Sequence, residues 1–400
     1  MLRLWSRRGL GPWLALLMVG FLLWSIVTNR PWRLEFDWGL RYLAASVYVF
    51  APLVAGCAAY DVGGRSGRDW LLIGRTTRRG VATALAPSGA ITLWAVSAVL
   101  LSWAAVALVV SLAQGIGPSD ALVAVEMVSA LAAAAVVGAV VGVLVEGLLA
   151  VAVSAGGVVL AAMMTSGAGS KLFQVATSTG SLIGIERTPA RALVTIASNT
   201  LVVAMGCLAV ALKFRSTRHG SRLLLVPLGI VLMTLVLVSR WPFTASEFRE
   251  STQPTRCVGK EVTLCGPAHA SPVLDRVAVD LSAALTRLQP SGLSLPTRFA
   301  IARGGDAARV PDGVTPISLE TEDFTQGHLP IQAMAEVFSV PRPCAAFDGD
   351  DTVHEYLAQV TLVRDWITLQ LTSDSPVVPA PDTIRAAFQR LATCPRTAPG

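Results

Sequence analysis

The residues that most resemble a catalytic site lie in the polar carboxy-terminal part of the chain. His354 and Glu355 begin a string similar to HExxH, the motif in which two histidines one helical turn apart bind zinc. The fifth residue is Ala358, so the second ligand is missing. The sequence also has no GxSxG nucleophile turn. We therefore expect no enzymatic activity and no cofactor.

An acidic cluster nearby has a second possible chemistry. Asp348, Asp350 and Asp351 could offer oxygen ligands to calcium, but the glycine and the distal glutamate of the calcium-binding loop are absent. An acidic turn that caps a helix explains these residues better.

Cysteines divide between the two parts of the chain. Cys57 and Cys207 lie in apolar runs and are interpreted as small buried residues, whereas four others are in the polar part: Cys257, Cys265, Cys344 and Cys394. An even number fits two disulfides in an oxidising compartment, with three possible connectivities. We favour Cys257 with Cys265 and Cys344 with Cys394, because the first pair closes a short loop with glycines nearby.

Zinc is the alternative for these cysteines. The first two are not spaced as CxxC, and His269 and His328 lie at no recognised ligand offset, so the sequence predicts no metal site.

Most of the chain before this polar part is expected to form membrane helices. Hydrophobic residues make up 53% of the chain and charged residues only 14%, too few to cover a soluble protein. A span needs about 20 apolar residues, and seven runs qualify. They are Leu10–Val27, Tyr42–Tyr60, Ala90–Leu112, Ala121–Val145, Leu148–Met164, Ala192–Leu212 and Leu223–Ser239.

Basic residues indicate how the spans are oriented. Residues 1–239 carry a net charge of +10 and residues 240–400 a net charge of −4, which together give the +6 of the chain. With a cytoplasmic amino terminus, twelve Lys and Arg lie in cytoplasmic segments and six in the opposite loops, as the positive-inside rule expects. Basic residues placed between apolar runs also argue against nucleic-acid binding. Seven crossings then make the carboxy-terminal domain extracytoplasmic.

Polar and small residues inside the spans are candidates for function. Glu126 and Glu146 lie near the ends of predicted spans, where solvated carboxylates are the favoured interpretation and a polar pathway or helix contact is the alternative. Gly138 and Gly142 have GxxxG spacing, which predicts close helix packing within a bundle or a dimer.

The segment from Asp61 to Gly80 joins two spans on the predicted cytoplasmic side. Its apolar centre and basic end fit a helix that lies on the membrane surface. The alternative is a docking element for a cytoplasmic partner, formed by Arg68, Trp70, Arg75, Arg78 and Arg79.

The layout of the first 220 residues resembles the permease subunits of ABC-2-type transporters. The resemblance rests on the six spans, the Ala-Ala-Tyr-Asp ending at Ala58–Asp61 and the Arg-rich loop that follows. The stretch 166–191 occupies the place of that family's re-entrant segment. The resemblance implies a homodimer or heterodimer in the membrane lipid and a separate ATPase that docks on the cytoplasmic loops, since this chain has no GxxxxGK[ST] loop.

We therefore predict an α-helical transmembrane bundle followed by a small α+β domain. Residues 1–220 form a six-span permease-like domain, residues 221–240 a seventh helix, and residues 241–400 the extracytoplasmic domain. Its expected helices and strands are Ser271–Leu288, Arg298–Arg303, Thr315–Leu319, Asp350–Leu371 and Asp382–Thr393. The expected function is transport of a lipid, peptide or small hydrophobic molecule across the cell membrane. The alternative is a non-transporting membrane protein whose external domain binds a ligand or partner.

Overall fold

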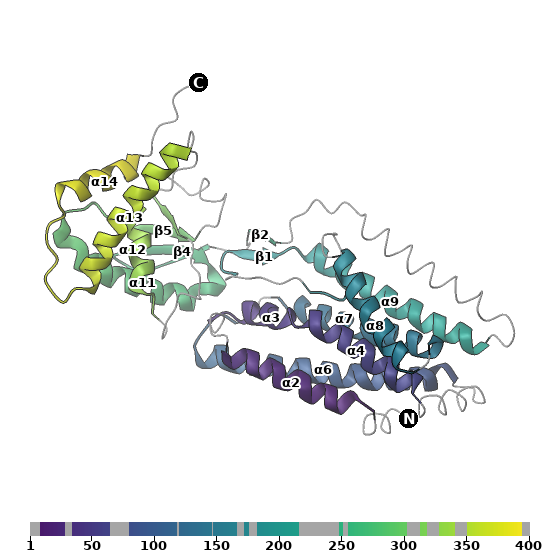
Figure 1. Ribbon diagram of the computed structural model, residues 1–400. Coiled ribbons are helices and arrows are strands. Elements are labelled where there is room, and N and C mark those ends of the chain that lie inside the picture. The colour runs from purple at the N-terminus through teal and green to yellow at the C-terminus, as the bar shows by residue number, and fades with distance from the viewer. Residues whose placement is uncertain are drawn as a thin grey trace.

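The computed structural model shows an elongated helical bundle joined to a smaller domain that contains a sheet (Figure 1). It describes residues 9–28, 34–64, 80–117, 120–145, 147–165, 172–175, 182–215, 248–250, 255–301, 313–317, 328–340 and 350–393. The bundle comes from the first 215 residues, and the smaller domain from residues 255–393.

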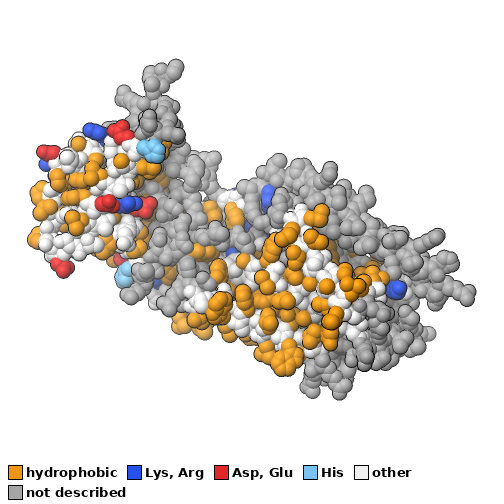
Figure 2. Space-filling view, viewed as in Figure 1, with side chains coloured by type: hydrophobic (Ala, Val, Ile, Leu, Met, Phe, Trp, Pro, Cys, Tyr) orange, Lys and Arg blue, Asp and Glu red, His pale blue; other side chains and the backbone are white. Residues whose placement is uncertain are grey.

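Long apolar helices build the bundle. They are α2 (Gly11–Thr28), α4 (Val47–Gly63), α6 (Gly80–Leu112), α7 (Leu122–Leu144), α8 (Leu148–Thr165) and α9 (Pro189–Arg215). In the described part of the chain, five helices are long and apolar enough to cross a membrane. A sixth span results if α4 is combined with α3 (Phe36–Ala44), which meets it at a bend of 46°. Apolar side chains cover much of the described bundle surface in Figure 2.

These helices overlap the first six predicted spans, although α6 begins at Gly80, ten residues before the predicted start, and α4 begins five residues after its predicted start. The main difference is α3, a separate short helix before α4 that the hydrophobic pattern does not reveal. The predicted span Leu223–Ser239 lies outside the described residues. Its two described neighbours lie far apart: α9 starts beside β2 (Phe248–Glu250) and extends away from it for 27 residues, about 40 Å at 1.5 Å per residue.

Two glycines of α7 set its distance from α4. A Cβ at Gly138 would lie 2.1 Å from the carbonyl oxygen of Ala55, and one at Gly142 would lie 2.7 Å from that of Ala59. Neither position has room for a side chain, so the two backbones meet directly. The small residues noted in the sequence thus pack helices within one chain.

Asp61 joins the first two long helices at the end of the bundle away from the sheet domain. Its carboxylate accepts a hydrogen bond from the backbone N–H of Leu10, with Oδ2 at 3.1 Å, just before α2 begins. A carboxylate at this position accepts a hydrogen bond from an N–H that has no partner within the helix. Its negative charge also interacts favourably with the positive end of the helix dipole.

The short segment Leu172–Val175 is buried between α8 and α9. The N–H of Phe173 donates to Asn199 Oδ1 at 3.3 Å, and the N–H of Leu172 donates to Thr165 Oγ1 at 3.2 Å. Phe173 has a φ of 53°, an uncommon value for a bulky residue, and its ring belongs to the bundle core. This part of the predicted re-entrant stretch therefore enters the bundle.

The smaller domain has a four-stranded mixed sheet in the order β3-β4-β5-β6. Its strands are β3 (Thr255–Val258), β4 (Thr263–Pro267), β5 (Arg298–Ile301) and β6 (Thr315–Ile317). The hairpin β3–β4 is antiparallel and the other two pairs are parallel. The α-helices are α11 (Ser271–Leu288), α12 (Ile331–Ser339), α13 (Asp350–Thr372) and α14 (Asp382–Thr393).

The predicted elements of this domain are confirmed, and the sequence missed three. Helix α11 has its predicted bounds, and α13 and α14 begin at the predicted aspartates. The two strands of the β3–β4 hairpin and α12 were not predicted. Phe299 on β5 and Phe338 on α12 meet edge to face, with ring centres 5.9 Å apart, in the core of this domain.

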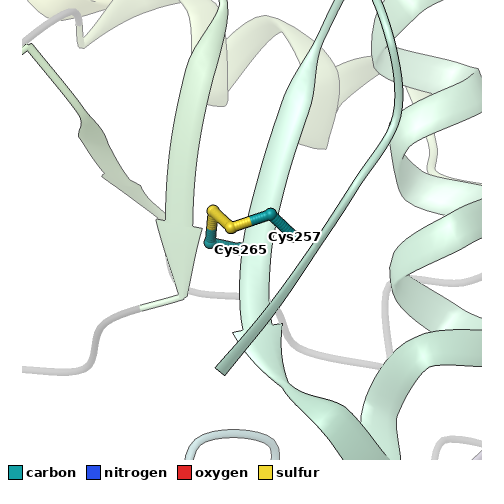
Figure 3. The surroundings of a disulfide bond; sticks show 2 residues. All are labelled: Cys257 and Cys265. Carbon is teal, nitrogen blue, oxygen red and sulfur yellow. A yellow bond between two sulfur atoms is a disulfide. The ribbon is translucent and has the colours of Figure 1, made fainter. Parts of the chain in front are cut away.

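A disulfide joins the hairpin strands at Cys257 and Cys265, which face each other in the β3–β4 register (Figure 3). This is the first predicted bridge. Cys344 and Cys394 lie outside the described residues. Cys57 and Cys207 are free thiols in the bundle.

Candidate functional site

A cavity of about 300 Å³ lies where the bundle meets the sheet domain, and we call it the junction cavity. Its described lining comes from α3, the starts of α7 and α9, the loops beside them, and the segments around β1 (Ile185–Arg187), β2 and β4. Its charged and titratable lining residues are Glu35, Asp37, Arg41, Asp120, Glu186, Arg187, Arg249 and His269. Apolar residues including Phe36, Ile116, Leu182 and Ile183 complete it.

Hydrogen bonds and a shared apolar core hold the two parts together around this cavity. Arg276 of α11 donates through Nη2 to the carbonyl oxygens of Ala113 and Gln114, at 3.0 and 2.7 Å, just beyond the end of α6. A guanidinium at this position donates to carbonyl oxygens that have no partner within the helix. Its positive charge also interacts favourably with the negative end of the helix dipole. Leu34 and Ile183 from the bundle side belong to the core of the sheet domain.

A buried ion pair lies against the cavity. Arg187, at the end of β1, donates through Nη1 to Glu126 Oε2 on α7, and the two side chains are 3% and 0% exposed. The structure thus corrects the solvated position that the sequence favoured for Glu126. Its carboxylate contacts a residue just before α9, which is the helix-contact alternative.

A second ion pair joins Arg41 of α3 to Asp120, just before α7. The Arg41 side chain is 1% exposed, and its guanidinium also lies over the ring of Phe248 on β2, 5.3 Å from the ring centre. Asp120 accepts the backbone N–H of Leu122 at 2.9 Å in the first turn of α7. One arginine therefore connects α3, the start of α7 and the strand that precedes the sheet domain.

The remaining carboxylates hold loops in place. Glu35 Oε2 accepts the backbone N–H of Leu182 at 2.7 Å, across 147 residues of sequence. Asp37 Oδ1 accepts the backbone N–H of Asp120 at 3.3 Å. Because buried carboxylates without partners are costly, these bonds explain how the acidic groups remain buried here.

The rim of the cavity is more open. Arg249 of β2 pairs with Glu186 of β1 at 2.7 Å, and the arginine side chain is 47% exposed. His269 lies on the short 3-10 helix η2 (Ala268–Ala270) after β4. Burial lowers the pKa of His269, and the negative charges of Asp37 and Glu186 oppose that shift only in part.

Such an arrangement can bind a charged or dipolar molecule. Guanidinium groups in fixed orientations recognise phosphate and carboxylate, whereas buried carboxylates recognise ammonium groups. Among the described residues, no group of three His, Cys, Asp or Glu is placed to hold a metal ion.

Of the predicted site residues, the structure brings together Cys257 and Cys265 in the sheet domain, but it does not gather the others at one site. Glu126 reaches the cavity through Arg187, whereas Gly138 and Gly142 pack α7 against α4 farther along the bundle. Glu146, Cys344 and Cys394 and the proposed docking residues (Arg68, Trp70, Arg75, Arg78 and Arg79) lie outside the described residues.

Sequence reasoning missed most of the cavity. Glu35, Asp37 and Arg41 lie within seven residues of one another, directly before a predicted span. That spacing places three charged residues along one helical stretch at a membrane boundary. It was the one sequence pattern that could have indicated a polar site here. Their partners Asp120 and Leu182 are far along the chain, so the pairing itself could not be inferred from the sequence.

Comparisons with protein-family models, with curated proteins and with solved structures found no match for this chain.

Proposed function

We propose that this chain is a permease-like subunit of the cell membrane. It works with a separate ATPase to move a lipid, a peptide or a small hydrophobic molecule, as a homodimer or with a similar subunit. The proposal draws on the five to six apolar helices found among the described residues, which are sufficient for a multi-pass membrane protein.

In this proposal the amino terminus is cytoplasmic and the sheet domain is extracytoplasmic. The excess of basic residues in the amino-terminal segments and in the loop 65–79 supports that orientation. The disulfide between Cys257 and Cys265 supports an oxidising environment for the sheet domain.

The junction cavity is the observation that carries the proposal. Charged side chains are rare in membrane bundles because burying them is costly, and those that occur usually mark a substrate or ion pathway. Here Arg41, Arg187 and Glu126 are almost completely buried at one end of an apolar bundle. A buried ion pair adds little to stability compared with apolar packing, so binding is the better explanation for these residues.

The test is purification of the full chain from its native membranes. We expect an ATPase to copurify with the native chain and to be lost from the double variant Arg78→Ala and Arg79→Ala. The matched control is Arg364→Ala, which removes an exposed arginine from α13 of the sheet domain. An ATPase retained equally by all three proteins would contradict the docking role of the loop.

A second candidate is a non-transporting membrane protein whose external domain binds a ligand or partner. The contact between α4 and α7 favours it, because the backbones meet at Gly138 and Gly142 and leave no opening between these two helices. Intact complexes that contain no ATPase, in a detergent that preserves known transporter complexes, would support this candidate over the first.

A further inference from the structure

Charged groups of both signs lie at the junction cavity. The carboxylates are Glu35, Asp37, Asp120 and Glu186, with Glu126 behind Arg187, and the guanidinium groups are Arg41, Arg187 and Arg249. Among the described residues at this cavity, carboxylates therefore outnumber guanidinium groups by two. Burial lowers the pKa of His269, which favours its neutral form.

Helix ends offset most of that excess. Helices α3, α7 and α9 all begin at the cavity, at Phe36, Leu122 and Pro189. The amino-terminal end of a helix carries the equivalent of roughly half a positive charge, so three of them nearly balance the two extra carboxylates. The site is therefore close to neutral and contains charged groups of both signs.

A near-neutral site built from opposite charges discriminates by charge pattern. An ion with only one charge is attracted by one set of groups and repelled by the other. A zwitterion can place its ammonium against carboxylates and its acidic group against guanidinium. In a partly enclosed cavity, both contacts are weakened less by solvent than at an exposed surface.

Size and apolar lining limit the ligand further. A volume of about 300 Å³ corresponds to roughly ten water molecules at about 30 Å³ each. That space suits a headgroup or a dipeptide and is too small for a folded segment. The apolar residues Phe36, Ile116, Leu182 and Ile183 give a short carbon chain a surface to contact.

We propose that the junction cavity binds a small zwitterion that carries an ammonium and a phosphate or carboxylate on a short chain. This inference deepens the proposed function, since it rests on the cavity being the ligand site. The same chemistry occurs in a phospholipid headgroup and in a free amino-acid-like solute, and the two sources are separated by the experiment.

Calorimetric titration of the full chain in detergent tests the charge pattern directly. The zwitterionic probe is glycerophosphoethanolamine, and its two halves, ethanolamine and glycerol 3-phosphate, are the single-charge controls. We expect the zwitterion to bind at least about tenfold more tightly than either half, which corresponds to one additional charged contact.

Two rim variants locate the binding. Glu186→Gln removes a carboxylate and Arg249→Gln removes a guanidinium from the pair at the rim, and both variants retain the side chains of the buried pairs Arg187–Glu126 and Arg41–Asp120. Each variant is expected to bind the zwitterion about tenfold more weakly than the native chain. Arg390→Gln is the matched control, because this exposed arginine lies on α14 away from the cavity lining.

The source is identified with two further probes. Greater thermal stability in nanodiscs of phosphatidylethanolamine than in phosphatidylglycerol, without binding of soluble probes, assigns a lipid headgroup. Binding of glycerophosphoethanolamine or glycylglycine in solution assigns a free solute, and either result supports the proposal.

Three results would overturn it: no binding of any probe together with equal stability in the two lipids, binding of one half as tight as the zwitterion, or an equal loss in Arg390→Gln. Because the titration needs neither ATPase nor transport, its failure leaves the copurification experiment intact. A missing ATPase likewise leaves the binding result intact.

Discussion

Glu126 shows how one residue in an apolar helix acquires a defined role. Its carboxylate is completely buried on α7 and is paired with Arg187, which comes from a strand 61 residues later. The sequence showed the carboxylate but not its partner. The two residues are 61 positions apart, so only the tertiary fold brings them together, and no local sequence pattern reveals the contact.

We predict that Glu126→Gln destabilises the protein strongly. The substitution removes the charged partner that Arg187 has on α7, and breaking a buried ion pair costs about 3–5 kcal/mol in comparable pairs. Thermal unfolding of the detergent-solubilised chain measures the loss. The double variant Glu126→Gln and Arg187→Gln should lose less than the sum of the single variants. Strict additivity in this cycle would show that the two residues do not interact.

A second prediction concerns the close contact at Gly138. In Gly138→Ala the new methyl group meets the carbonyl oxygen of Ala55 at 2.1 Å, so α7 must move away from α4. Overpacking of this kind costs about 1–3 kcal/mol and lowers the melting temperature.

The matched control is Gly156→Ala on α8, where a Cβ has no neighbour within 4 Å. It should be neutral or slightly stabilising, because alanine favours a helix over glycine. Equal losses in both variants would mean that loss of glycine, and not the clash, is responsible.

At the scale of elements, long helices could be predicted and short ones could not. The apolar runs and the amphipathic pattern of Ser271–Leu288 are strong local signals, and both gave the correct element. Helix α3 has only nine residues and carries Asp37 and Arg41, so it is too short and too charged to qualify as a membrane span. Its stability comes from contacts with residues around position 120, which no local pattern contains.

The β3–β4 hairpin depends on its disulfide. Cys257 and Cys265 close a loop with a separation of eight residues, and a loop of this size contributes about 2–3 kcal/mol in the chain-entropy account. We expect the double variant Cys257→Ser and Cys265→Ser to unfold the sheet domain at a lower temperature. Cys207→Ser, which removes a free thiol of the bundle, is the control. A reductant should lower the midpoint of the native chain and leave the double variant unchanged.

His269 on η2 is expected to make the stability of the sheet domain dependent on pH. Burial lowers the pKa of His269 below its ordinary value of 6.5, so the unfolded chain binds a proton more readily than the folded one. The contribution of this residue is complete above the ordinary histidine pKa and is lost as the pH falls through it toward the folded value. We expect His269→Asn to flatten the decline in stability below that pKa, measured by chemical unfolding at a series of pH values. An unchanged slope would exclude His269 as the group responsible.

On the scale of the whole molecule, the bundle and the sheet domain behave as one packed unit. The core of the sheet domain includes Leu34, Ile116 and Ile183, all from loops at the end of the bundle. The pair β1–β2 joins the segment before α9 to the segment before the sheet domain. The sequence indicated two parts, since composition changes after the last span, but it contained no sign of this shared core. Contacts between apolar residues that are far apart in the sequence leave no pattern in either segment from which they could be predicted.

The last prediction tests that connection through Arg276. Its guanidinium donates to the carbonyl oxygens of Ala113 and Gln114, so Arg276→Ala leaves both acceptors without this donor at the end of α6. The domain should then separate more often from the bundle, and amide exchange should increase on both sides of the contact, in residues 113–117 and at the start of α11. Arg364→Ala is the control. This arginine is exposed on α13, and the ion pair it makes there is with its sequence neighbour Asp365, so the pair does not connect the two parts of the molecule. Hydrogen–deuterium exchange of the full chain in detergent measures the effect. Faster exchange confined to α11 would mean that Arg276 stabilises its own helix alone, whereas faster exchange on both sides requires the two parts to open together.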